Sequence, residues 1–283
     1  MKRINVLVLC TTLFLGGLWV PAAFAERKDH CDDYLCLKMV HNSGKVTFRA
    51  HNLNKKAKLS LRLKLKTKNM DSNVKLPLRL VLEPGEKRLL AIVKAKPKKR
   101  YQFQYWYHYT FGDLNAKHDD SATYFLPVAP GSVANVSQGC SGSFSHKGTR
   151  QFATDITMPI GTPIHAARGG MVVSVKQDSN RGGRSRANEK HANHIYIRHS
   201  DGTLGIYFHL KQNGSEVEEG DVVEARQLIG YSGNTGWSTG PHLHFEVAVP
   251  NRNMKWQSQK VSFDIEKGQV SCPANKKIRA KNL

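Results

Sequence analysis

A strict alternation of apolar and polar residues constrains the fold of this chain more than any other feature of its sequence. Residues 59–66 alternate leucine with serine, arginine and lysine, and residues 101–109 alternate tyrosine or phenylalanine with glutamine, tryptophan and histidine. Successive side chains of a β-strand point to opposite faces, so each run predicts a strand with one apolar face. The aromatic face suits either a sandwich core or a platform for stacking sugars or bases. We favour the core, because inward aromatic side chains dominate core burial.

The remaining sequence is also divided into short β-rich runs and turns, which predicts an all-β protein with two domains. Residues 26–120 are expected to form a small β-sandwich that acts as an accessory domain. Residues 121–132 contain Leu126-Pro-Val-Ala-Pro-Gly-Ser132 and resemble a linker. The second domain is expected over residues 133–273, and residues 274–283 are predicted to be a basic tail. Within the second domain, residues 178–193 hold three arginines and are most simply a solvated loop.

The amino terminus has the pattern of a secretory signal peptide over residues 1–25. Lys2 and Arg3 precede an apolar run from Val6 to Val20, and Ala23-Phe-Ala25 suits cleavage before Glu26. A run of about 15 residues is shorter than the roughly 20 that span a bilayer. We therefore expect export and cleavage, no transmembrane anchor afterwards, and a periplasmic or secreted location.

Export also affects the interpretation of the five cysteines. Cys10 is expected to leave with the signal, and an even set of four remains in a compartment where disulfides persist. Four cysteines allow three pairings. We prefer Cys31–Cys36 with Cys140–Cys272, because the first pair is close in sequence and each bridge then stays within one predicted domain.

The charge of the chain indicates an anionic partner. Its 43 Lys and Arg residues exceed its 22 Asp and Glu residues, which gives a formal net charge of +21. Such a balance suits nucleic acid, acidic lipid or an anionic wall polymer. Residues 26–125 hold 22 basic and 10 acidic side chains, so most of the excess lies in the first domain. We expect this domain and the basic tail to bind an anionic envelope surface, whereas export and the lack of a recognisable motif argue against a specific nucleic-acid partner.

Histidines of the second domain indicate a metal site. In His242-Leu243-His244 the period of a strand places both imidazoles on one face, although such a pair alone is a weak signal. His209 lies near the end of another predicted strand, and His146 and Asp155 flank an eight-residue segment. A hydrolytic zinc site needs three imidazole or carboxylate ligands and one open position for water. His146, Asp155 and His244 would supply that set.

Six short motifs of the second domain follow one another in a fixed order. They are Ser145-His146, Ala153-Thr-Asp155, Gly161-Thr-Pro-Ile-His-Ala-Ala-Arg-Gly-Gly170, Tyr207-Phe-His-Leu210, Gly230-Tyr-Ser-Gly-Asn-Thr-Gly236 and Gly240-Pro-His-Leu-His-Phe-Glu246. Over about residues 126–250 this order resembles the lysostaphin-like zinc peptidases that cleave peptidoglycan, which include the LytM and β-lytic metalloproteases. The resemblance implies a mainly antiparallel β-sheet with the metal in a groove.

The same resemblance assigns roles to five residues. It implies that His146, Asp155 and His244 bind Zn²⁺, while His209 and His242 act on the water and on the scissile carbonyl oxygen. The eight residues between His146 and Asp155 exceed the three that are commonest in the family, and a β-turn excursion is expected to absorb them. Glu246 suits either a carboxylate that orients a ligand or an ordinary cross-strand partner.

The function implied is an exported zinc endopeptidase that hydrolyses peptide cross-links of bacterial peptidoglycan through a metal-activated water. One alternative is a noncatalytic wall-binding or hydrolase-activating module that keeps the motifs as a scaffold. Another is a zinc protease that acts on Gly-rich secreted proteins. Noncatalytic relatives usually lose metal ligands or catalytic histidines, whereas all five positions are filled here, so we favour the peptidoglycan enzyme.

Overall fold

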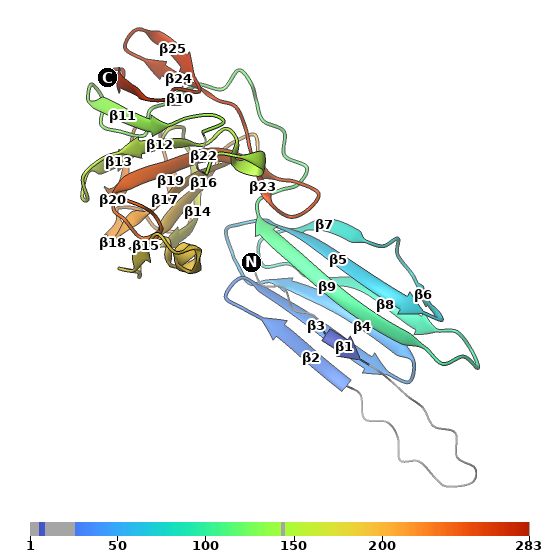
Figure 1. Ribbon diagram of the computed structural model, residues 1–283. Helices are drawn as coiled ribbons and strands as arrows, with labels where there is room; N and C mark the ends of the chain where they lie inside the picture. Colours follow the sequence, from blue (N-terminus) through green and yellow to red (C-terminus); the bar gives the residue numbers. More distant parts are fainter. Residues whose placement is uncertain (1–5, 9–25, 143–144, 283) are drawn as a thin grey trace. The chain divides into compact units, whose positions relative to one another are not determined.

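The computed structural model describes residues 6–8, 26–142 and 145–282, whose regular secondary structure is almost entirely β-strand (Figure 1). The prediction of an all-β protein is confirmed. Contacts divide the chain into unit 1, Met1–Leu114 with Arg252–Met254, and unit 2, Asn115–Asn251 with Lys255–Leu283. The predicted signal segment and Cys10 lie outside the described residues, apart from residues 6–8. In the described ranges no helix has the length and hydropathy needed to cross a membrane.

Unit 1 contains two sheets. One has the strand order β1-β9-β5-β7 and the other has the order β2-β3-β4-β8-β6. Their bounds are β1 Val6–Val8, β2 Glu26–Cys31, β3 Leu35–Asn42, β4 Lys45–Asn52, β5 Leu59–Lys68, β6 Met70–Ser72, β7 Leu78–Leu82, β8 Lys87–Ala95 and β9 Gln102–Phe111.

The aromatic strand predicted from the sequence is β9, and its apolar face lies in the core of unit 1. Phe103 and Tyr105 are buried, and the ring of Tyr105 meets the edge of Phe48 on β4 with the ring centroids 5.0 Å apart. The core interpretation of this strand is therefore confirmed. The opposite face of neighbouring β5 carries exposed Lys64 and Lys66, as its alternation predicted.

Unit 2 is larger and is organised around one long sheet with the order β19-β14-β16-β17-β22-β12-β11-β26, to which β23 is added by pairing with β22. The elements of unit 2 are β10 Tyr124–Phe125, β11 Val133–Gln138, η1 Gly148–Arg150, β12 Thr154–Thr157, β13 Pro163–His165, β14 Gly170–Lys176, β15 Gly182–Gly183, η2 Arg186–His191, β16 His194–Arg198, β17 Leu204–Phe208, β18 Leu210–Ser215, β19 Val222–Val223, β20 Leu228–Ser232, β21 Gly236–Trp237, β22 His242–Pro250, β23 Trp256–Ser258, β24 Ser262–Ile265, β25 Gly268–Ser271 and β26 Lys276–Arg279.

The two faces of the long sheet have different roles. Ile156 on β12 and Leu243 and Phe245 on β22 are buried in the core of unit 2. Because neighbouring residues of a strand point to opposite faces, Asp155 and His244 lie on the other face. The core therefore fixes the strands from one side and leaves polar side chains together on the other.

Both preferred disulfides are present. Cys31 is bonded to Cys36 within unit 1, and Cys140 is bonded to Cys272 within unit 2. Each bridge stays inside one unit, as the sequence argument required.

The segments that were predicted as a linker and as a basic tail both contain paired strands. Residues 276–279 of the predicted basic tail form β26, which pairs antiparallel with β11 and buries Ile278 between two exposed cations. In the predicted linker, β10 pairs with β24, and Leu126 and Val128 are buried. The apolar side chains of both segments join the core of unit 2, which explains why they are ordered despite their composition.

We expect two buried histidines to make unit 2 sensitive to acid. Burial lowers the pKa of His199 to about 4 and the pKa of His194 to about 3. Both pKa values lie below the value of about 6.5 that holds in an unfolded chain. Between the folded and the unfolded pKa, the unfolded state therefore binds more protons than the folded state. The stability that comes from burying the two neutral histidines is fully present above pH 6.5 and falls as the pH drops toward 4. At pH 5 we expect each histidine to cost about 2 kcal/mol of the free energy of unfolding.

Urea unfolding of the protein between pH 7.5 and pH 5 tests this expectation. His199→Phe removes one titrating ring, whereas His165→Phe removes a partly exposed ring of the same unit as a control. The stability of the His199→Phe variant should depend on pH with a slope about one proton smaller than that of the wild type. An unchanged slope would contradict the assignment.

Candidate metal centre

Three side chains from separate segments converge on the polar face of the long sheet. Asp155 on β12 pairs directly with His244 on β22, and His146 lies in the loop before η1. One ligand atom from each of these three residues lies within 4.8 Å of the others, and all three residues are buried. The excess residues between His146 and Asp155 form the short 3-10 helix η1 instead of the expected β-turn.

The hydrogen bonds of His146 leave one ring nitrogen available. Its Nδ1 lies 2.8 Å from the carbonyl oxygen of Gly139, which can only accept, so Nδ1 carries a proton. Its Nε2 is buried, has no hydrogen-bond partner among the described residues and lies 3.1 Å from Oδ1 of Asp155. In the neutral ring this arrangement turns a lone pair toward a carboxylate oxygen, and a cation between the two atoms would satisfy both.

Asp155 and His244 form the other side of the cluster. Oδ1 of Asp155 lies 2.8 Å from Nδ1 of His244, and Oδ2 accepts a hydrogen bond of 2.8 Å from the Gln138 side chain. Desolvation raises the pKa of Asp155, but the close contacts of its carboxylate with the rings of His146 and His244 outweigh that effect and hold the pKa well below its usual range. Burial lowers the pKa of His244, while Asp155 and Glu246 together raise it to about 9.

These properties fit a bound metal ion. The cluster offers two imidazole nitrogens and one carboxylate oxygen, which is the donor set of a hydrolytic zinc site with a fourth position for water. Asp155 and Glu246 favour the protonated form of His244, whose pKa they raise. A metal ion would take the place of that proton and would also satisfy the orphaned Nε2 of His146.

A second carboxylate lies behind His244. The Glu246 side chain is fully buried, and Oε1 lies 3.6 Å from Nε2 of His244 and 3.9 Å from Nε of Arg150. Neither carboxylate oxygen has a hydrogen bond in the described part of the chain. Because Glu246 faces Nε2, it favours the ring orientation that presents Nδ1 to Asp155 and to a metal.

Substitution of Glu246 should therefore change metal affinity. We expect Glu246→Leu to weaken metal binding about 10- to 100-fold, whereas Glu246→Gln, which keeps an acceptor oxygen, should retain most of it. Equilibrium competition with a chromophoric chelator measures the affinity. The exposed Glu224 provides a control as Glu224→Gln, and a Glu246→Leu variant that binds metal as tightly as the wild type would refute this role.

The other two predicted site histidines lie beside the cluster. The ring centroids of His209 and His242 are 4.6 Å apart, and the ring centroid of His209 is 6.2 Å from that of His244. Nδ1 of His209 donates to the carbonyl of Thr235 at 2.6 Å, and Nδ1 of His242 donates to the carbonyl of Gly240 at 2.8 Å. In both rings the free nitrogen is therefore Nε2.

Burial keeps these two rings neutral. It lowers the pKa of His209 to about 3 and also lowers the pKa of His242. His209 has a left-handed backbone with φ of 68°, a conformation that non-glycine residues adopt at a cost and that is frequent at functional sites. It lies between the end of β17 and the start of β18, where it turns the imidazole toward His242.

The sequence did not predict the groups that contact and orient the candidate ligands and the two further histidines. They are the Gln138 side chain, the carbonyls of Gly139, Thr235 and Gly240, and Arg150. Gln138 pairs with Asp155 across β11 and β12, a relation that no local pattern announces. Backbone carbonyls carry no sequence signal at all.

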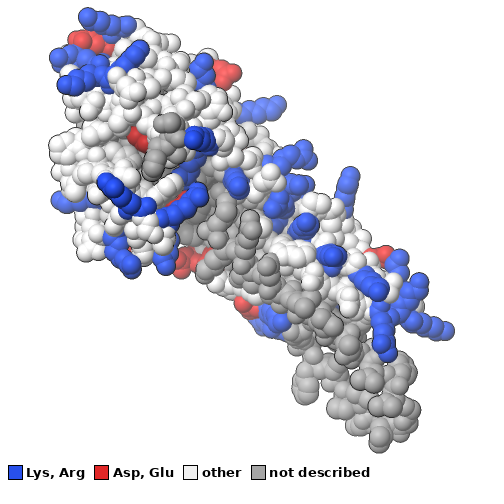
Figure 2. All heavy atoms as spheres, viewed as in Figure 1, with Lys and Arg blue, Asp and Glu red and all other residues white. Residues whose placement is uncertain are grey.

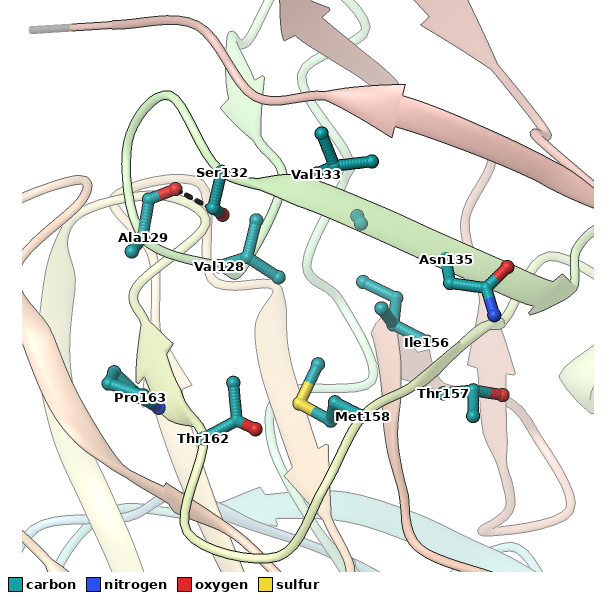
Figure 3. A pocket seen from close by; sticks show the side chains of 11 residues that line it. Val128, Ala129, Ser132, Val133, Asn135, Ile156, Thr157, Met158, Thr162 and Pro163 are labelled. Carbon is teal, nitrogen blue, oxygen red and sulfur yellow. Dashed lines mark hydrogen bonds between the residues drawn. The ribbon is translucent and has the colours of Figure 1, made fainter.

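A separate pocket of unit 2 is not part of this cluster. It has a volume of about 260 Å³ and lies along β11, β12 and β13, where Figure 3 shows Val128, Ile156 and Met158 around it. None of the described residues that line it is ionisable. It therefore offers no ionisable side chain as an acid, a base or a metal ligand.

An antiparallel β-domain that groups two histidines and an aspartate beside two further histidines has the features of a metal-dependent hydrolase. Residues 149–258 match the family model described as peptidase family M23. Unit 2 thus contains a domain of peptidase family M23, and the predicted resemblance to lysostaphin-like peptidases is confirmed.

Individual proteins are similar to parts of this chain. Peptidoglycan DD-endopeptidase ShyA of Vibrio cholerae is 38% identical over 99 residues, which are 35% of this chain and 20% of that protein. Glycyl-glycine endopeptidase ALE-1 of Staphylococcus capitis is 37% identical over 100 residues, which are 35% of this chain and 25% of that protein. The solved catalytic domain of lysostaphin from Staphylococcus simulans is 30% identical, with 45% of this chain and 87% of that chain covered and a TM-score of 0.32. The chain spans about a fifth of the length of the first curated relatives that it matches.

Proposed function

We propose that this chain is an exported, zinc-dependent endopeptidase that hydrolyses peptide cross-links of peptidoglycan. The observation that carries the proposal is the cluster of His146, Asp155 and His244 with His209 and His242 beside it. Family membership and the names of the relatives support the substrate class. A module that binds the wall without cutting it would not need two histidines with free, deprotonated Nε2 atoms next to the cluster.

In this proposal His146, Asp155 and His244 hold zinc, which when bound supplies Lewis acidity and lowers the pKa of water to about 7. His209 and His242 are neutral at pH 7, since burial lowers the pKa of each. One of them accepts a proton from the attacking water at Nε2. The resulting imidazolium can then donate from Nε2, while its Nδ1 proton stays bound to a backbone carbonyl. The second ring can stabilise the negative charge that develops on the carbonyl oxygen of the scissile bond once its Nε2 carries a proton.

Mass analysis of wall fragments tests the activity directly. Purified zinc-loaded protein is incubated with wall sacculi, and the soluble products are identified by mass. Cross-linked peptides should separate into their halves without cleavage of the glycan strands. Wall binding without product, together with a lack of stoichiometric zinc in the purified protein, would favour the noncatalytic module.

Unit 1 is proposed to hold the enzyme on the anionic envelope. The outer face of β5 carries Lys64, Lys66 and Lys68, and Lys64 lies over the ring of Trp106 on β9 at 5.8 Å. Figure 2 shows that Lys and Arg side chains outweigh Asp and Glu on the face in view, and that they gather over the strand ends of unit 1. Clustered cations attract polyanions, and salt screens that attraction.

Removing these charges should weaken wall binding. We expect a variant with Lys64→Gln, Lys66→Gln and Lys68→Gln to bind sacculi more weakly at low salt and to show a flatter dependence of binding on salt concentration. A variant with Lys55→Gln, Lys56→Gln and Lys87→Gln removes the same charge from other exposed sites of unit 1. Pelleting assays at several salt concentrations measure both. Equal losses of sacculus binding in the two variants would show that binding depends on the net charge of unit 1 and not on the outer face of β5.

A further inference from the structure

The segment 178–193, which we call the arginine loop, is attached to the residues that hold the two candidate catalytic histidines. Its strand β15 pairs in parallel with β21, and the N–H of Gly236 donates to the carbonyl of Arg181 at 2.8 Å. The preceding residue, Thr235, accepts the hydrogen bond from His209. The arginine loop therefore borders the end of the site where His209 and His242 lie.

The cations of this loop have no acidic partners in the described part of the chain. The loop has two acids, and both turn to cations outside it, Asp178 to Lys176 and Glu189 to Arg150, the latter at 3.6 Å. Four exposed cations are left without an ion pair, namely Arg181, Arg184, Arg186 and Lys190. In Figure 2 several Lys and Arg side chains lie over the part of unit 2 where Figure 1 shows β15 and η2.

The loop is also held in a defined conformation. The indole N–H of Trp237 donates to the carbonyl of Arg184 at 2.9 Å, and the guanidinium of Arg186 lies over the Trp237 ring at 5.1 Å. At its base, the fully buried Asn193 exchanges hydrogen bonds with the backbone N–H and carbonyl of Ser179. The cations are thus presented from a scaffold that is hydrogen-bonded at both ends, not from a free solvated loop.

We propose that the arginine loop binds a carboxylate of the substrate peptide next to the scissile bond, so that the enzyme selects cross-links that carry free carboxylates over neutral ones. The proposal rests on the proposed endopeptidase function. A guanidinium pairs with a carboxylate through two parallel N–H donors, and such charge-assisted pairs bind more tightly than neutral hydrogen bonds. A glycine bridge offers no side-chain carboxylate to these cations.

Two synthetic cross-linked peptides of identical sequence test the proposal, one with free carboxylates beside the scissile bond and one with the same groups amidated. The wild type should cleave the acidic peptide with a KM about 10-fold or more lower, because a charged hydrogen bond is lost in the amide. The Arg181→Gln, Arg184→Gln variant should lose this preference through KM, with kcat nearly unchanged. Arg181→Lys, Arg184→Lys should keep part of it, since the charge remains and the fork is lost.

A matched control removes two exposed cations elsewhere in unit 2, as Lys267→Gln with Lys276→Gln, and should leave the preference intact. Equal KM values for the two peptides in the wild type, or an undiminished preference in the Arg181→Gln, Arg184→Gln variant, would overturn the inference while the endopeptidase function stands. Cleavage of neither peptide would count against the function. In that case, equilibrium binding of the same two peptides tests the inference. Tighter binding of the acidic peptide by the wild type, lost in the Arg181→Gln, Arg184→Gln variant, would support it. Equal binding of the two peptides would refute it.

Discussion

We expect the His244→Ala variant to lose both stoichiometric zinc and endopeptidase activity. His244 is buried, and its Nδ1 lies 2.8 Å from Asp155, so alanine removes one of three candidate ligands and leaves the carboxylate without a partner on that side. Lewis acid assistance is worth several kcal/mol of transition-state stabilisation, and 1.36 kcal/mol is tenfold in rate. The rate of cross-link cleavage should therefore fall by about a thousandfold or more in a metal-buffered assay.

The control for this variant is His165→Ala. His165 belongs to unit 2 and is partly exposed, and its Nδ1 donates to the carbonyl of Arg226, away from the cluster. It should keep its zinc and most of its activity. If His244→Ala released cross-link products as fast as the wild type, the metal mechanism would be wrong.

The His209→Ala and His242→Ala variants should separate catalysis from metal binding. Neither residue belongs to the group of three that can share a metal, and both present a free Nε2. A positioned general acid or base contributes about 10²- to 10⁴-fold to a rate. Each variant should therefore lose that much in kcat while it retains a full equivalent of zinc by metal analysis. Loss of zinc together with activity would instead make the ring a ligand or a structural support of the cluster.

The sequence predicted the parts of the site that follow from strand geometry. His242 and His244 share a face because a strand has period two, and the apolar residues between and after them face the core. The register that sets Asp155 opposite His244 was not predictable from local pattern, because it depends on the pairing of β12 with β22, some 90 positions apart. Resemblance to a family supplied that relation.

Other features depended on tertiary contacts and escaped prediction. The segment Lys276-Lys-Ile-Arg279 has a composition typical of a solvated tail, yet Ile278 is buried and the segment adds an edge strand beside β11. The arginine loop has the composition of a solvated segment, but its backbone pairs with β21. In both cases a few backbone hydrogen bonds and one apolar or amide side chain decide the outcome, against the tendency of the charged residues.

The Cys140–Cys272 bridge sets an order of events for the assembly of the candidate metal centre. Cys140 follows Gly139, whose carbonyl holds the ring of His146, and its partner lies 132 residues later in the sequence. A growing chain that has not yet reached residue 272 holds every candidate ligand and both candidate catalytic histidines, but it lacks the covalent tie on the segment that carries His146. This covalent constraint on the candidate centre can therefore be added only after residue 272 has been synthesised.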